Sequence, residues 1–185
     1  MKAGTRRKRA YILLLVIGSQ IVRKIIFISL RIRGYSGISS ECVIEHGVAF
    51  DKVNPESIII EDRAVVSSGS VILSHEHVFS NKSYTTVIEK GAFLAVRCTV
   101  FPGAVVGRES IVGASSVVRR KVPPYSFVTG NPAKVVGFKM KPEEIIEYEK
   151  KKYSENERIP LEKLEKNYQK YFINRLNEIK EFTKI

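Results

Sequence analysis

Cysteine and histidine are scarce in this sequence, which contains two cysteines and three histidines. Cys42 and Cys98 lie far apart, and this spacing excludes a disulfide framework and a cysteine-based metal site. Both cysteines are expected in the core. Acidic residues are absent from residues 1–34, which contain nine Lys or Arg. The formal net charge of +12 is therefore concentrated at the N-terminus.

The N-terminal segment also lacks the stretch of about 20 apolar residues that a membrane-spanning helix requires. The apolar run from Ala10 to Ile17 is followed by polar residues and then by Arg23-Lys24. We expect residues 1–34 to form an amphipathic or core-packing helix. The cluster Arg6–Arg9 suits peripheral contact with an anionic membrane surface, or is a solvated tail. No nucleic-acid recognition motif accompanies it. We expect a cytoplasmic protein, at the inner face of the membrane.

Residues 35–138 carry a hexapeptide repeat. From residue 88 every sixth residue is aliphatic: Ile88, Leu94, Val100, Val106, Val112 and Val118. Four residues after each of the first five stands a small residue: Ala92, Cys98, Ala104, Ser110 and Ser116. The same phase occurs upstream in two shorter pieces, beginning at Ile38 and at Ile60. A period of six fits neither a simple helix nor a simple strand, so it predicts short strands joined by tight turns.

Three such units would form one triangular coil, and successive coils would pair as parallel strands. The repeat therefore predicts a mainly β solenoid. Its phase breaks twice, between Phe50 and Ile60 and between Ile72 and Ile88. Insertions in a solenoid form loops on one side, often the binding side. The second insertion, about residues 73–87, contains His75 and His77.

The pattern changes after the repeat. Pro123-Pro124 predicts the end of regular strand pairing near residue 122. Residues 139–185 are rich in Lys, Glu, Tyr and Leu and predict a helical extension, with one helix from Pro142 and another from near Pro160. The apolar stripe of the second helix begins at Leu161 and should pack on the solenoid or on another subunit.

Residues 111–137, reading IVGASSVVRRKVPPYSFVTGNPAKVVG, closely resemble the closing segment of hexapeptide-repeat acetyltransferases, the family of galactoside, maltose and virginiamycin acetyltransferases. The run from Gly130 to Val135 is the most specific part. The turn Phe101-Pro102-Gly103 also matches the family. The resemblance covers roughly residues 38–137.

This resemblance implies a left-handed parallel β-helix, a homotrimer with active sites between subunits, and acetyl-coenzyme A as acyl donor. It implies that the first His of the His-x-His loop is the catalytic base, so that His75 and His77 are the candidate catalytic residues. By the same pattern the coenzyme-binding residues are Ala95, Ala114, Arg119, Arg120 and Lys134. No metal is required.

Acyl transfer to a hydroxyl needs a base, and histidine titrates in the appropriate range. The sequence thus favours an acetyl-coenzyme A-dependent O-acetyltransferase acting on a sugar or cell-surface glycan precursor, with serine or a nucleotide-sugar amine as other acceptors. Two alternatives stay open. One is a zinc enzyme of the γ-carbonic-anhydrase type, which would need three histidine ligands. The other is a non-catalytic scaffold at the membrane surface.

Overall fold

The computed structural model describes residues 24–76 and 82–174. The chain divides into two compact units, residues 1–36 and 37–185. In the first unit, residues 24–32 are helical. Among the residues described, no helix combines the length and apolar character needed to cross a bilayer. The expected apolar run at residues 10–17 lies outside them.

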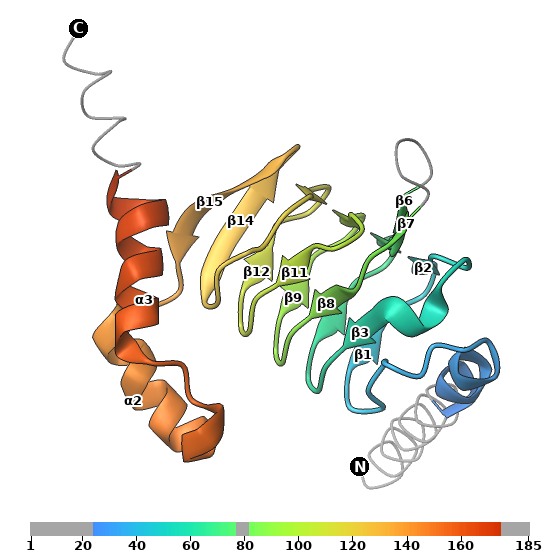
Figure 1. Ribbon diagram of the computed structural model, residues 1–185, viewed down its shortest axis with the longest axis horizontal. Coiled ribbons are helices and arrows are strands. Elements are labelled where there is room, and N and C mark those ends of the chain that lie inside the picture. Colours follow the sequence, from blue (N-terminus) through green and yellow to red (C-terminus); the bar gives the residue numbers. More distant parts are fainter. Residues whose placement is uncertain (1–23, 77–81, 175–185) are drawn as a thin grey trace, which may run out of the picture. The chain divides into compact units, whose positions relative to one another are not determined.

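The second unit is a left-handed parallel β-helix with three sheets (Figure 1). Sheet A consists of β3 (Ile58–Ile60), β8 (Thr86–Ile88) and β11 (Val105–Val106). Sheet B consists of β1 (Val43–Ile44), β4 (Val65–Val66), β9 (Phe93–Leu94), β12 (Ile111–Val112), β14 (Ser126–Gly130) and β15 (Ala133–Phe138). Sheet C consists of β2 (Ala49–Phe50), β5 (Val71–Ile72), β10 (Thr99–Val100) and β13 (Val117–Val118).

The large repeat residues stack in register along each sheet. In sheet C, for example, Ile72 pairs with Val100, and Val100 pairs with Val118. These three side chains are almost completely buried, as are small repeat residues such as Cys98 and Ala104. The hexapeptide spacing therefore builds a continuous apolar column inside the coil, and the predicted fold class is confirmed.

Three corners connect the sheets. We call them the A–B corner (residues 61–64, 89–92 and 107–110), the B–C corner (45–48, 67–70, 95–98 and 113–116) and the C–A corner (51–57, 73–85, 101–104 and 119–121). The A–B corner turns through left-handed backbone at Arg63, Gly91 and Glu109. Glycine suits position 91, because its φ is +66° and a Cβ there would crowd the carboxylate of Glu109.

Pairing continues past the prolines, contrary to the expectation from Pro123-Pro124. Val122 bridges to Val106, and β14 pairs parallel with β12. The two prolines occupy a corner, where no ladder N–H is required. The chain then reverses at Asn131-Pro132, a cis peptide bond, and β15 returns antiparallel to β14.

Two helices cover the last coil (Figure 1), and the predicted C-terminal helices are confirmed. They are α2 (Pro142–Lys152) and α3 (Leu161–Tyr168); the short 3-10 helix η2 (Glu155–Glu157) lies between them, and α3 continues as the π-helical turn η3 (Gln169–Ile173). Ile145, Ile159 and Leu164 pack with Tyr125 in one buried cluster. This cluster caps the open end of the solenoid, as the terminal coil of a repeat protein requires. The later part of the expected stripe lies beyond the described residues.

Candidate functional site

Both insertions leave the solenoid at the C–A corner. The first follows β2 and contains the 3-10 helix η1 (Pro55–Ser57); the second follows β5 and contains the antiparallel hairpin of β6 (His75–Glu76) and β7 (Lys82–Ser83). Figure 1 shows this hairpin protruding from the stack. The hydroxyl of Ser74 donates to the carbonyl of Asn54 at 2.9 Å, so the two insertions contact each other.

The register of sheet C forms a column of residues along this corner. Asp51, Leu73, Phe101 and Arg119 each follow a sheet C strand, and the backbone N–H groups of the first three donate to the carbonyl one coil along at 2.8–2.9 Å. Arg119 also lies over the Phe101 ring, with its Cζ 5.2 Å from the ring centroid. One corner thus carries a carboxylate and the histidine loop on successive coils, and a cation two coils beyond the loop.

Asp51 fixes the first residues of the histidine loop through its carboxylate. Its Oδ2 accepts the backbone N–H groups of Ser74 at 3.1 Å and His75 at 2.8 Å, and its Oδ1 accepts that of Val53 at 2.9 Å. Burial alone would raise the pKa of Asp51, but these three hydrogen bonds outweigh it and hold the pKa below its ordinary value. The carboxylate therefore stays ionised and fixes the backbone from which His75 projects.

His75 has an exposed fraction of 7%, so its surroundings restrict its orientation. The loop is held on its other side as well, because the N–H of Tyr84 donates to the carbonyl of Ser74 at 2.7 Å. The hydroxyl of Thr86 donates to the carbonyl of Leu73 at 2.6 Å and accepts the N–H of Gly103 at 3.1 Å. His77 lies outside the described residues.

The predicted cationic residues come together at the last coil, where Arg119 and Arg120 belong to the C–A corner and Lys134 belongs to β15 of sheet B. Arg119, Arg120 and Lys134 line one cavity of about 650 Å³, and the other residues lining it are Val118, Lys121, Val122, Pro123, Val128, Ala133, Val135, Lys170 and Tyr171. No carboxylate belongs to this set of described residues. A concave surface with five cations is suited to binding phosphate groups.

Ala95 and Ala114 lie elsewhere, at the B–C corner. The N–H of Ala95 donates to the carbonyl of Val112 at 3.0 Å, and Ala114 is exposed. A shallow cavity of about 440 Å³ opens on this corner, lined by His46, Gly47, Ser68, Gly69, Val96, Arg97 and Ser115. Within one chain, the structure therefore does not place the two alanines beside the cationic cavity, the one lined by Arg119, Arg120 and Lys134.

The histidines are also separated. His46 is exposed at the B–C corner, whereas His75 lies at the C–A corner. Across the described ranges 24–76 and 82–174, no group of three or more His, Cys, Asp or Glu is arranged to hold a metal ion. Sequence reasoning missed Asp51, although it stands at the first break of the hexapeptide phase.

No protein-family model matches the chain. The chain is 38% identical over 53 residues to dTDP-3-amino-3,6-dideoxy-alpha-D-galactopyranose 3-N-acetyltransferase of Aneurinibacillus thermoaerophilus, covering 29% of this chain and 28% of that one. It is 28% identical over 87 residues to "Putative acetyltransferase YvoF" of Bacillus subtilis, covering 46% and 51%. The chain thus spans about half or less of the length of these curated relatives.

Among solved structures, the fold is similar to that of AntD, an N-acyltransferase from Bacillus cereus, in complex with dTDP-4-amino-4,6-dideoxyglucose and coenzyme A. The TM-score is 0.51 at 20% identity, covering 62% of this chain and 69% of that one. These similarities confirm the resemblance expected from the GNPAKV segment. In parts of its sequence and in its fold, the chain is similar to acetyltransferases of the hexapeptide-repeat type.

Proposed function

We propose that the protein transfers an acetyl group from acetyl-coenzyme A to a hydroxyl of a small acceptor, a sugar or a cell-surface glycan precursor. The observation that carries this proposal is the C–A corner, which carries His75 and, two coils further along, Arg119 and Arg120, two of the cations that line the cavity. A base and an anion-binding surface in that arrangement suit a reaction between an alcohol and a phosphate-bearing acyl donor.

In the proposed reaction, His75 accepts the proton of the acceptor hydroxyl as its oxygen attacks the thioester carbonyl. A tetrahedral oxyanion forms, and backbone N–H groups stabilise it. The carbon–sulfur bond then breaks, and the imidazolium returns the proton to the leaving thiolate. Asp51 acts as a positioning residue through its hydrogen bonds to the backbone of Ser74 and His75.

Arg119, Arg120 and Lys134 would bind the phosphates of the coenzyme, because guanidinium and ammonium groups form charge-assisted hydrogen bonds with them. Ala95 and Ala114 are the proposed contacts of the pantetheine arm. Since they lie on a different corner of the same chain, the proposal requires a second subunit to bring its B–C corner beside the C–A corner of the first.

An apolar ladder supports the proposed homotrimer. The outward residues of sheet B align in register from coil to coil: Val43, Val65, Phe93, Ile111 and Phe127. Three of them are exposed, Val43 at 43%, Phe93 at 39% and Phe127 at 40%. A contiguous apolar strip of this kind is typical of a protein–protein interface.

The test is to measure thiol release from acetyl-coenzyme A with a panel of sugars and serine. His75→Ala is expected to lower turnover about 10²–10⁴-fold, the usual contribution of general base catalysis. The KM for acetyl-coenzyme A should stay near the wild-type value, because His75 lies outside the cationic cavity.

Glu147→Ala is the control, since Glu147 is exposed on α2, away from both corners of the proposed site, and it should leave turnover unchanged. His77→Ala shows whether the second loop histidine contributes. Turnover that survives both His75→Ala and His77→Ala would refute the proposed mechanism.

Acylation of an amine is the second candidate. It is favoured by the similarity to a dTDP-amino-sugar N-acetyltransferase and by the shared fold of AntD. A neutral amine is a stronger nucleophile than an alcohol and depends less on a base. Including dTDP-amino sugars in the same assay, with and without the His75→Ala substitution, separates the two activities.

Two other functions have less support. A zinc enzyme would need three histidine ligands, and the sequence has His46, His75 and His77, of which His46 lies on a different corner of the chain from His75. Zinc analysis of the purified protein tests it. A non-catalytic scaffold would not need a cavity with five cations, and absence of coenzyme A binding would favour it.

Peripheral membrane contact through the N-terminal unit is also proposed. In the helix at residues 24–32, Ile25, Ile28 and Ile32 are 60%, 60% and 80% exposed, and Lys24 and Arg31 accompany them. Exposed apolar side chains flanked by cations suit an anionic membrane surface at the cytoplasmic face.

A further inference from the structure

The C-terminal extension is firmly attached where the chain leaves the solenoid. Phe138 at the end of β15 packs against Tyr168 and Phe172, with ring centroids 5.3 and 6.2 Å away. Tyr168 and Phe172 contact each other at 5.2 Å. Edge and tilted contacts of this kind stabilise the packing beyond the burial of the rings alone. They fix the helix relative to β15.

Directly after Tyr168 the helix widens into the π-helical turn η3 (Gln169–Ile173), which includes Phe172. Such turns are rare and occur frequently at functional sites. The same turn carries Lys170 and Tyr171, which line the cavity that also contains Arg119, Arg120 and Lys134. One set of side chains therefore anchors the extension, while the residues between them form a wall of the cavity.

Lys170 and Tyr171 differ in exposure and chemistry. Lys170 is exposed and Tyr171 is half-buried, and Lys170 Nζ lies 5.0 Å from the centroid of the Tyr171 ring. An ammonium group binds phosphate as a point charge, and an aromatic ring offers a stacking surface for a base. The two side chains together match a phosphorylated nucleoside.

We propose that Lys170 and Tyr171 bind the 3′-phosphoadenosine end of the coenzyme, Lys170 at the 3′-phosphate and Tyr171 at the adenine. This inference rests on the proposed function, because it assumes that the coenzyme occupies the cationic cavity. It gives the C-terminal extension, which lies outside the hexapeptide segment, a direct role in donor recognition.

Calorimetric titration of the full chain with coenzyme A and with 3′-dephospho-coenzyme A tests the inference. The wild type is expected to bind coenzyme A about tenfold more tightly than the dephospho form, since it gains one charge-assisted contact. Lys170→Gln keeps the aliphatic stem and removes the charge. It should raise the Kd for coenzyme A about tenfold and leave that for the dephospho form unchanged.

Tyr171→Ala should weaken both ligands alike, because both carry adenine. Lys166→Gln is the matched control, an exposed lysine on α3 that is not among the residues lining the cavity, and it should behave as the wild type does.

The inference would be overturned if Lys170→Gln still preferred coenzyme A over 3′-dephospho-coenzyme A by the same factor as the wild type. The proposed function would still stand in that case, provided that the wild type binds coenzyme A and Arg120→Ala weakens that binding. If the wild type binds neither form, the proposed function fails and this inference fails with it.

Discussion

At the scale of single residues, Asp51 connects the two insertions. Its carboxylate accepts three backbone N–H groups, two of them from the histidine loop. It is 8% exposed, so water cannot readily replace these hydrogen bonds. Asp51 therefore determines where the backbone of His75 lies, although it provides no atom to the proposed reaction.

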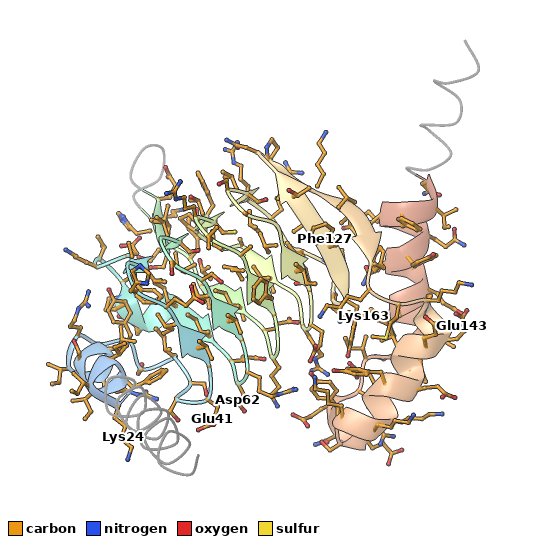
Figure 2. The ribbon with its side chains drawn as sticks, turned by 180° about the vertical axis from the view of Figure 1, so that it is seen from behind. Lys24, Glu41, Asp62, Phe127, Glu143 and Lys163 are labelled. Carbon is orange, nitrogen blue, oxygen red and sulfur yellow. The ribbon has the colours of Figure 1, made fainter. Side chains whose placement is uncertain are left out.

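We expect Asp51→Asn to lower turnover at least tenfold, because the histidine loop loses the hydrogen bonds that position it. The KM for acetyl-coenzyme A should stay unchanged, because Asp51 does not line the cationic cavity. An amide has one acceptor oxygen, so at least one N–H loses its partner. The free energy of unfolding should fall by about 2 kcal/mol. Steady-state kinetics and urea unfolding measure the two effects. Asp62→Asn, at an exposed position (Figure 2), should cause neither.

The effect of Asp51→Asn on stability should depend on pH. Because the pKa of Asp51 is lower in the folded chain than in the unfolded chain, its stabilising contribution is complete above the unfolded pKa of about 3.9. The contribution is lost as the pH falls through the folded pKa. The stability difference between wild type and variant should therefore narrow below about pH 4, and a difference independent of pH would contradict this account.

The residue scale also shows the limits of sequence reasoning. The histidine loop was predicted because its insertion breaks a strict period. Asp51 was not, because a single Asp after Phe50 carries no pattern. Its role depends on hydrogen bonds between segments more than twenty residues apart, and neither composition nor spacing records such contacts.

At the scale of elements, the strands and their inward residues follow directly from the six-residue period, since each strand is only a few residues long and repeats its neighbour. The six-residue period did not predict that the solenoid continues through β14 or that the chain reverses into β15. Pro123-Pro124 resembles a terminator in the sequence. The structure places both prolines at a corner, where their missing N–H groups cost nothing.

The contact between α2 and the solenoid depends on a buried carboxylate. Glu149 is fully buried; its Oε1 accepts the hydroxyl of Tyr125 at 2.5 Å and its Oε2 accepts the N–H of Ile159 at 2.9 Å. Arg108 lies 3.4 Å away. Burial raises the pKa of Tyr125, and the nearby carboxylate raises it further, so the phenol stays protonated and donates.

We expect Glu149→Ala to lower the free energy of unfolding by about 3 kcal/mol, because it leaves Arg108 without its buried partner. Glu149→Gln should cost less, since the amide oxygen still accepts one hydrogen bond. Thermal or urea unfolding followed by circular dichroism measures both. Glu147→Ala, an exposed position on α2, serves as the control. Equal stability of Glu149→Ala and Glu147→Ala would show that the buried carboxylate does not hold the helix.

At the scale of the whole molecule, the proposed trimer depends on the apolar ladder of sheet B. Phe127 belongs to β14 (Figure 2) and is partly exposed, as is Phe93 two strands away. We expect the double substitution Phe93→Lys and Phe127→Lys to convert the trimer to monomer, because it places two cations in an apolar interface. Sedimentation velocity measures the change.

Circular dichroism distinguishes dissociation from unfolding in that variant. Glu147→Lys, which alters charge on the surface of α2, should sediment as the wild type does. A wild-type chain that is already monomeric at micromolar concentration would contradict the proposed assembly. It would also leave Ala95 and Ala114 without a place in the donor site.

Through the family resemblance, the sequence named Arg119, Arg120 and Lys134, three of the cations that line the cavity, but it did not indicate that Lys170 and Tyr171 join them. Those two residues lie more than thirty positions after Lys134, in a helix whose stripe indicated packing alone. Their placement depends on how the aromatic cluster at Phe138 sets the helix against β15, and this arises from tertiary structure.

The residues that follow the sheet C strands at the C–A corner are spaced at fixed distances along the axis of the solenoid. Strands one coil apart are separated by about 4.8 Å, so Leu73, at the root of the histidine loop, and Arg119, two coils on, are about 10 Å apart along the axis. An additional coil or a missing coil between them would change this gap by about 5 Å without altering any side chain. The number of repeats thus sets how long a donor molecule must be to reach from its phosphate anchor to the imidazole.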